Sequence, residues 1–148
     1  ADLVFRKILR DNGAALRDFL KEFDKVIAQL KDAKGDDLEA IHRELSGAYG
    51  AVGKAAAHLG ALSKEDLDYV AAISVPFEKA LATAACGMMM ARSALAAQEL
   101  MAQGGEDAAF LDRKILHARF FAESMLPIAA AQAQSVLTSS RTIVAANF

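Results

Sequence analysis

A glutamate and a histidine on one predicted helix are the first candidates for chemistry in this chain. Glu39 and His42 have the Glu-x-x-His spacing found in di-iron and di-manganese sites of four-helix bundles. Those sites need the motif on two helices and one further glutamate from each of the other two. Neither His58 nor His117 follows a glutamate at that spacing. The ligand set is incomplete, so we predict no metal site.

Sulfur-containing side chains form a second group, in which Cys86 precedes Met88, Met89 and Met90. Thiolate and thioether ligands select soft metals. Consecutive residues of a helix point about 100° apart, however, so three adjacent methionines cannot converge on one ion. Cys86 is the sole cysteine, and its own segment offers no base that would activate the thiol. We expect the methionines to fill gaps in the packing and Cys86 to be a small core residue.

A third group lies in the segment 114–123, where isoleucine, leucine and phenylalanine surround His117. This setting favours a packing histidine with a hydrogen-bond partner. Arg119 and Glu123 are four residues apart, the spacing at which opposite charges pair along a helix. The chain has no Gly-x-Ser-x-Gly or Cys-x-x-Cys sequence and no glycine-rich phosphate loop after a strand. We therefore predict no catalytic, cofactor-binding or metal-binding residue.

The composition predicts the scaffold that carries these residues. A chain of 148 residues is long enough for one domain. Hydrophobic residues make up 54% and charged residues 24%, which predicts a folded core rather than a disordered tail. Alanine supplies 33 residues and proline two, which favours long helices over strands. A net charge of −2 argues against a nucleic-acid partner, since such proteins usually carry a basic surface.

Four helical segments follow from the apolar spacing and the turn residues. They are expected at about 2–34 with an interruption at Asn12-Gly13, from Asp36 through Leu59, from a capping box at Ser63–Asp66 to Gln103, and from Glu106 to Ser139. We expect Pro76 to kink or break the third helix near Ile73, and Pro127 to bend the fourth. Short connections between long helices predict an all-α protein, an up-down-up-down four-helix bundle with kinked third and fourth helices.

The second predicted helix contains Gly47, Gly50 and Gly53 at three-residue spacing. An interior glycine costs roughly 0.5–1 kcal/mol relative to alanine. Either another helix approaches this side closely and offsets the cost, or the helix is simply weak. The sequence leaves both interpretations open.

Charged side chains are distributed unevenly along the chain. Residues 1–68 carry 24 of the 36 charged side chains and residues 69–148 carry 12. The third and fourth helices have too few charges to cover their solvent-facing sides, so we expect part of their alanine-rich outer surface to be buried against a partner. A small-residue surface that is simply exposed is the alternative. Ala94 and Ala97 are the positions at which we predict the contact.

Targeting signals are not apparent in the sequence. Residues 1–7 lack the basic-then-apolar pattern of a signal peptide, and their apolar spacing looks like a helix cut from a longer chain. The most apolar stretch, residues 80–102, is interrupted by Arg92 and Glu99, which makes it too polar for a spanning helix of about 20 apolar residues. We expect a cytoplasmic protein without a membrane span.

Two segments carry a resemblance to a known family. Residues 1–13, Ala-Asp-Leu-Val-Phe-Arg-Lys-Ile-Leu-Arg-Asp-Asn-Gly, resemble the stretch that follows the Tyr-Glu-Gly-Thr-Asn-Gly-Ile-Gln segment of certain bacterial acyl-CoA dehydrogenases. Residues 114–127, Lys-Ile-Leu-His-Ala-Arg-Phe-Phe-Ala-Glu-Ser-Met-Leu-Pro, resemble the Lys-Ile-x-x-Ala-Arg-Phe-Tyr-Ala-Glu-x-x-Leu-Pro signature of their extra C-terminal domain. The resemblance is to the 3-methylmercaptopropionyl-CoA dehydrogenase-like group and, with the matching helix order, extends over nearly the whole chain.

The resemblance implies that residues 1–148 form one C-terminal helical domain of a longer FAD-dependent enzyme. Such enzymes oxidise an acyl-CoA thioester to the trans-2-enoyl-CoA, using a catalytic glutamate in the Tyr-Glu-Gly-Thr segment. That glutamate and the flavin-holding Gly-Ile-Gln would precede Ala1, so no catalytic residue of the family falls on this sequence. Phe121 stands where the signature has a tyrosine, which removes one hydroxyl. The implied role is to pack on the chain's own dehydrogenase core domains and to support a homodimer, without activity of its own.

Two other classes of protein share the predicted fold. A free-standing helical-bundle interaction module would be encoded without an upstream dehydrogenase. A ferritin-like metal enzyme would contain bound iron or manganese. The length of the native polypeptide distinguishes the interaction module from the dehydrogenase domain, and a metal assay distinguishes the metal enzyme.

Overall fold

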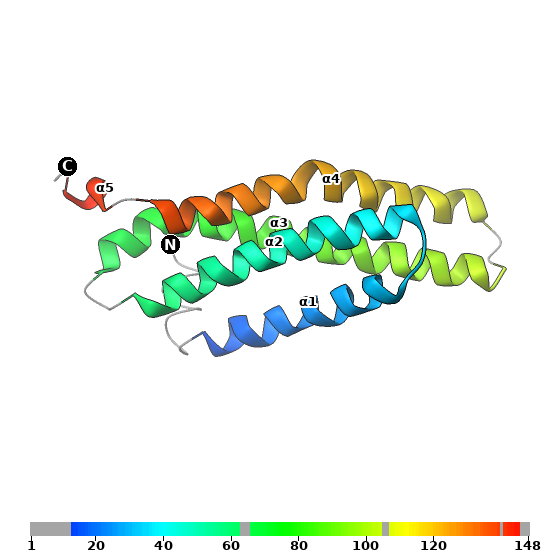
Figure 1. Cartoon of the computed structure of the whole chain (residues 1–148), viewed down its shortest axis with the longest axis horizontal. Helices are drawn as coiled ribbons and strands as arrows, with labels where there is room; N and C mark the ends of the chain where they lie inside the picture. The colour runs from blue at the N-terminus through cyan, green and yellow to red at the C-terminus, as the bar shows by residue number, and fades with distance from the viewer. Residues whose placement is uncertain (1–12, 63–65, 105–106, 140, 146–148) are drawn as a thin grey trace.

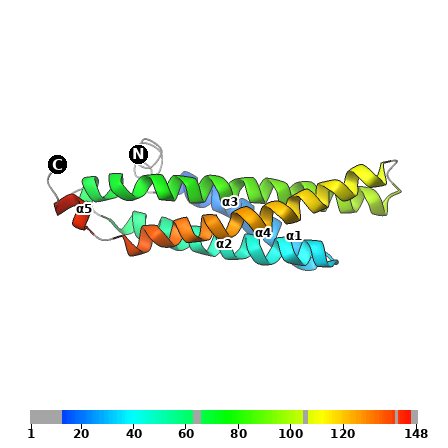
Figure 2. The same ribbon diagram turned by 90° about the horizontal axis from the view of Figure 1, so that it is seen from above.

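The residues that the structure describes form four long helices and one short turn of helix near the C-terminus (Figure 1). The computed structural model describes residues 13–62, 66–104, 107–139 and 141–145. The helices are α1 (Ala14–Asp32), α2 (Asp36–Ala61), α3 (Leu67–Ala102), α4 (Ala108–Thr138) and α5 (Thr142–Ala145). Each long helix runs antiparallel to the next (Figure 2), and no strand occurs in the described ranges. The predicted all-α four-helix bundle is confirmed.

The two central helices are α2 and α3, with α1 and α4 on opposite sides of them. Helix α4 packs along both α3 and α2, whereas α1 contacts α2 and α3; no contact joins α1 to α4 in the described part of the chain. Figures 1 and 2 both show the α3–α4 hairpin extending beyond the α1–α2 turn. Helices α3 and α4 therefore have outward sides that the other helices of the bundle leave uncovered.

Most helices begin and end close to the predicted residues, because local signals determine their ends. Gly13 and Gly35 precede α1 and α2 with φ of 75° and 115°, a backbone region that favours glycine. The Asp107 carboxylate caps α4 by accepting a hydrogen bond from the Phe110 N–H at 2.8 Å. The capping box predicted at Ser63 begins outside the described residues, and Asp66 precedes α3 without a side-chain cap bond.

Both prolines lie inside continuous helices, Pro76 in α3 and Pro127 in α4. Of the two outcomes expected at Pro76, a kink or a break, the break does not occur, and the kinks predicted at Pro76 and Pro127 are not confirmed. A proline removes one backbone hydrogen bond and crowds the carbonyl four residues earlier, but it leaves the bonds of the flanking turns in place. Helices α3 and α4 also pack against each other, which supports their continuity.

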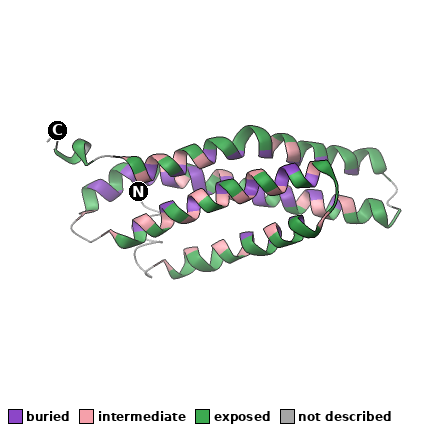
Figure 3. Cartoon of the chain, viewed as in Figure 1, coloured by how far each residue is buried: buried purple, intermediate pink, exposed green. Residues whose placement is uncertain are grey.

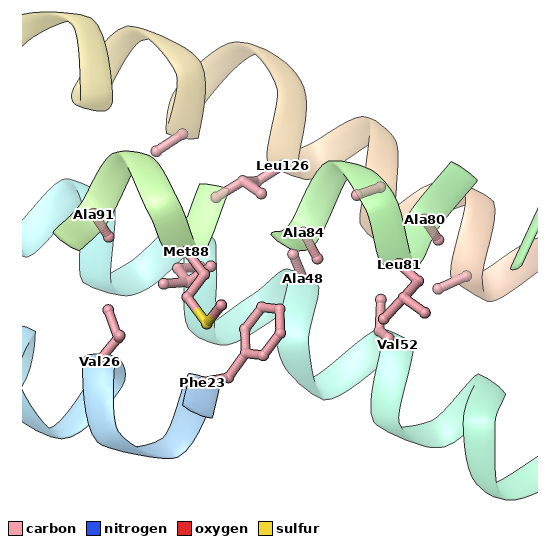
Figure 4. Close-up of a cluster of buried hydrophobic side chains, with 14 of the residues drawn as sticks. Phe23, Val26, Ala48, Val52, Ala80, Leu81, Ala84, Met88, Ala91 and Leu126 are labelled. Carbon is pink, nitrogen blue, oxygen red and sulfur yellow. The ribbon is translucent and has the colours of Figure 1, made fainter. Parts of the chain in front are cut away.

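Small residues are frequent among the buried positions of α3 and α4. Buried alanines occur at positions 80, 84, 91, 94 and 97 of α3 and at positions 118, 122, 129 and 133 of α4. At Gly87 the helices are so close that a Cβ atom would lie 2.6 Å from the Cδ2 atom of Leu126. Figure 4 shows Leu126 beside α3, among the other buried apolar side chains. The alanine and glycine content of these helices therefore allows a close approach within the chain.

Ala94 and Ala97 belong to this internal core, with 0% and 3% of their surface exposed. The prediction that they face an external partner is wrong. Alanine is small and apolar enough to suit either side of a helix, so its presence does not show which side points outward. Here these alanines lie on the inward side of α3, in the chain's own core.

The glycines of α2 do not mark a close approach. A Cβ atom built at Gly47, Gly50 or Gly53 would have no described atom within 4 Å apart from those of its own helix and neighbours. Of the two interpretations that the sequence left open, the structure favours a locally weak helix.

Helix α1 is attached to the bundle by an aromatic stack and an ion pair. Phe23 is fully buried and stacks on Tyr49 of α2, with ring centroids 5.2 Å apart. Burial, together with a hydrogen bond to Asp24, raises the pKa of Tyr49 to about 12. Glu22 accepts a hydrogen bond from Arg92 of α3 at 2.7 Å, and its ion pairs, chiefly that with Lys25, lower its pKa. These contacts fix α1 to both central helices.

Candidate functional site

The structure keeps apart the residues that would be needed for a metal or catalytic site. Glu39 is exposed and His42 is partly buried on α2, while Cys86 and His117 lie on α3 and α4. Within the described ranges, no three side chains of His, Cys, Asp or Glu gather closely enough to hold a metal ion. The described ranges do carry an apolar surface, on α3 and α4, which is the candidate functional feature.

Cys86 is exposed, so the prediction that it is a core residue is wrong. Helix α3 is apolar on nearly all sides, and hydrophobicity alone does not identify its inward side. The three methionines point in different directions, as predicted: Met88 is buried, Met89 is 57% exposed and Met90 is partly buried.

His117 is also exposed, so the prediction of a packed histidine is wrong. The buried side of α4 runs through Leu111, Ile115 and Ala118, and His117 lies outside that stripe. The apolar neighbours of His117 in the sequence therefore do not surround it in space.

Arg119 forms the predicted ion pair with Glu123, with Nε and Oε1 3.0 Å apart. It also bonds Asp37 of α2, with Nη1 and Oδ1 2.8 Å apart, a pairing that the sequence did not predict. The hydrogen bond to Asp37, followed in size by the one to Glu123, raises the pKa of the Arg119 guanidinium above its usual value. The bond to Asp37 joins α4 to the first turn of α2 and has no local signal in the sequence.

Exposed large apolar side chains concentrate on α3 and α4. Of twelve such residues in the described ranges, ten lie on these two helices and none on α2. They are Leu67, Val75, Met89, Leu100 and Met101 on α3, and Phe110, Leu116, Phe120, Met125 and Ile128 on α4. Figure 3 shows exposed residues along the outward sides of the helices. The apolar surface lies on the helices that the charge asymmetry indicated, although residues larger than alanine form it.

A shallow groove crosses the outward side of α3. It has a volume of about 510 Å³ and is lined by Phe19 of α1, by Ala85, Cys86 and Met88–Met90 of α3, and by Phe121 of α4. Positions 75, 79, 82, 86, 89, 93, 96 and 100 follow this side of α3 at helical spacing, and Lys79 is the sole charged residue among them. The groove itself is therefore apolar, and the ion pair between Arg92 and Glu22 lies elsewhere on the surface of α3 and α1.

Helix α3 is long and apolar enough to cross a membrane by length and composition, with a mean hydropathy of 1.3 in its most apolar window. This differs from the prediction that the region is too polar. The bundle buries 39% of that window, and a core helix of a soluble protein passes the same test. One such helix is weak evidence for a membrane span.

A second hollow, of about 290 Å³, lies where the C-terminal segment meets the start of α3. Arg141 pairs with Asp66 and lies over the ring of Tyr69, with the guanidinium carbon 4.8 Å from the ring centroid. The Tyr69 hydroxyl donates a hydrogen bond to the Ser139 carbonyl at 2.9 Å. These side chains bond one another and hold the C-terminal segment against α3.

Comparison with known proteins agrees with the resemblance found in the sequence. Residues 16–147 match the family described as acetyl-CoA dehydrogenase C-terminal like. Over 146 residues the chain is 32% identical to a 3-methylmercaptopropionyl-CoA dehydrogenase of Ruegeria pomeroyi. The alignment covers 99% of this chain and 24% of that relative, so the chain spans about a quarter of the relative's length. The family match extends over most of the chain, which therefore belongs to the acetyl-CoA dehydrogenase C-terminal-like family.

Proposed function

We propose that this chain acts as the C-terminal helical domain of a longer, FAD-dependent acyl-CoA dehydrogenase. In that role it forms a single domain, packs on the dehydrogenase core of its own polypeptide and supports a cytoplasmic homodimer. It does not oxidise acyl-CoA alone. The matched relative is a dehydrogenase about four times as long as the matched segment, which supports this assignment.

The observation that carries the proposal is the apolar outward side of α3. The inward side of this helix packs in the core, yet Val75, Met89 and Leu100 on the outward side are exposed. A helix that is apolar all round is normally buried all round. Large exposed apolar patches mark interaction surfaces. Docking on a larger folded partner would remove this surface from water.

The two hollows described above do not fit FAD. A flavin dinucleotide needs cations or backbone N–H groups for its pyrophosphate, whereas apolar side chains line the groove on α3. In the C-terminal hollow, Arg141 is already paired with Asp66. We therefore assign the cofactor, the acyl-CoA thioester and the catalytic base to the rest of the polypeptide, and we derive no reaction step from this chain.

A second apolar face, on α4, supports the proposed dimer. Leu116, Phe120 and Ile128 are exposed on this helix, and Phe120 has 71% of its surface exposed. The sequence has no charged residue between Glu123 and Arg141. Docking through α3 leaves this face for a second subunit. A stable interface buries about 1,600 Å² in total, more than one helix face supplies, so we expect the core domains to contribute the remainder.

The experiment compares Phe120→Glu with Ala57→Glu in the complete polypeptide. Phe120 lies on the proposed dimer face, and Ala57 is exposed on α2. Because burying an unpaired carboxylate is costly, Phe120→Glu should shift the dimer toward monomer and lower the melting temperature, whereas Ala57→Glu should do neither. Light scattering gives the mass and thermal unfolding the stability.

Equal behaviour of the two variants would contradict a dimer role for α4. Absence of bound flavin and of acyl-CoA oxidation in the complete wild-type polypeptide would contradict the dehydrogenase assignment. In that case the free-standing interaction module would become the better hypothesis.

A further inference from the structure

We infer that the groove on α3 receives an apolar surface from the dehydrogenase portion of the same polypeptide, with an acidic side chain of that surface beside Lys79. This inference rests on the proposed function. It deepens that function by naming the docking surface and the chemistry of its partner.

The chemistry of the groove defines the partner as apolar. Phe19 and Phe121 lie on helices α1 and α4, and Cys86, Met89 and Met90 contribute to the lining from α3. The sulfur atoms are weak hydrogen-bonding groups, and the other side chains offer none. The flexible, unbranched methionines can adapt to the shape of a side chain placed against them. The groove is therefore suited to an apolar ridge, such as one face of an amphipathic helix.

Lys79 constrains how the partner can be oriented in the groove. It lies seven residues before Cys86 on the same side of α3, which is roughly 10 Å along the helix axis. It is exposed, and it makes no ion pair with any described residue. Charges at the edge of an apolar interface fix register and partner choice. We therefore expect an aspartate or glutamate of the partner at this position.

The length of the relative favours the same polypeptide over a second copy of this domain as the occupant. Charge does not distinguish the two, because exposed Glu99 lies ten residues after Met89 and Lys79 ten residues before it, so two antiparallel copies could pair them. The relative has three quarters of its length outside the matched segment. A surface in the same polypeptide is present at an effective concentration in the millimolar range, so even a modest apolar contact suffices for docking.

Site-resolved alkylation of Cys86 in the complete, native polypeptide tests the inference. Cys86 is exposed in this domain, and tryptic cleavage after Lys79 and Arg92 isolates it in one peptide. N-ethylmaleimide is the reagent, and the rate in urea is the unprotected reference at each site. The control is an Ala57→Cys variant, whose introduced thiol lies on the exposed side of α2. Docking should slow alkylation of Cys86 at least about tenfold relative to its rate in urea, and should leave the thiol at position 57 unprotected.

A second variant, Met89→Glu, distinguishes docking from a local effect on the thiol. A carboxylate at this exposed position should undock the surface and speed the alkylation of Cys86 severalfold. Without docking, the added negative charge should slow the reaction instead, because it disfavours the thiolate.

The remaining outcomes decide the occupant. Fast alkylation of Cys86 in a polypeptide that binds flavin and oxidises acyl-CoA would overturn the inference, and with it docking through α3, and would leave the dehydrogenase assignment intact. Protection that disappears when the subunits dissociate on dilution would show that a second copy covers the groove, and protection that requires anionic lipid vesicles would show that a membrane does; either result would overturn it. A native polypeptide without flavin or dehydrogenase activity would instead contradict the proposed function.

Discussion

The close approach of α3 and α4 at Gly87 can be tested by adding one methyl group. A Cβ atom at this position would lie 2.6, 3.1 and 3.2 Å from the Cδ2, Cδ1 and Cγ atoms of Leu126. Leu126 is 1% exposed, so its side chain has little room to move. Gly87→Ala should therefore strain the packing between the two helices. Gly50→Ala is the matched control, because it makes the same chemical change on α2 with nothing nearby to clash.

The two variants should differ in the free energy of unfolding. The helical preference of alanine should stabilise Gly50→Ala by about 0.5–1 kcal/mol. The same gain applies at Gly87, but overpacking a core costs about 1–3 kcal/mol, which leaves that variant neutral or destabilised by up to about 2.5 kcal/mol. Urea unfolding of the 148-residue chain, followed by circular dichroism, measures both free energies.

A second substitution identifies the clashing partner. Leu126→Ala alone should cost about 2–5 kcal/mol because it leaves a cavity. In the Gly87→Ala background the cost should be smaller by about 0.5–3 kcal/mol, since the new methyl group occupies part of the vacated space. If Gly87→Ala stabilises the chain as much as Gly50→Ala does, or if the two substitutions at the α3–α4 contact are additive, the close approach is refuted.

Three further predictions concern α1 and the ion pair on α4. Phe23→Ala removes a fully buried ring and should cost about 3–5 kcal/mol, with amide exchange accelerated most in α1; unchanged exchange there would contradict the role of the stack. Tyr49 has a pKa raised to about 12, above the value near 10 in an unfolded chain, so the unfolded state loses its proton first and stability should fall between about pH 10 and pH 12. Tyr49→Phe should remove this component from the pH dependence of the urea midpoint, and an identical pH profile would refute it. Arg119→Ala should lower the unfolding midpoint at low salt and less so at 1 M salt, since it removes the pairs with Asp37 and Glu123; a salt-independent loss would show that packing rather than charge is responsible.

The sequence predicts the helices well because the signals for them are local. The starts of α2 and α4 follow from Asp36 and Asp107, and the pair Arg119–Glu123 follows from a spacing of four. The charge asymmetry likewise identifies the helices with an apolar surface, because a count of charged residues does not depend on which side of a helix faces inward.

The sequence does not predict which side of an apolar helix faces the core. Around α3 nearly every side is apolar, so periodicity does not separate buried Ala94 from exposed Cys86. The requirement for glycine at Gly87 depends on Leu126 of another helix and has no signal nearby in the chain. For the same reason the groove between Phe19 and Phe121 appears only once three helices are assembled.

The most direct test of the central claim is the mass of the native polypeptide in its source cell, measured by blotting with an antibody raised against this domain. The matched segment makes up 24% of the dehydrogenase relative, so the claim predicts a band at about four times the 15.7 kDa of this chain. A band at 15.7 kDa would contradict it, because a chain of that size has no dehydrogenase core on which to dock.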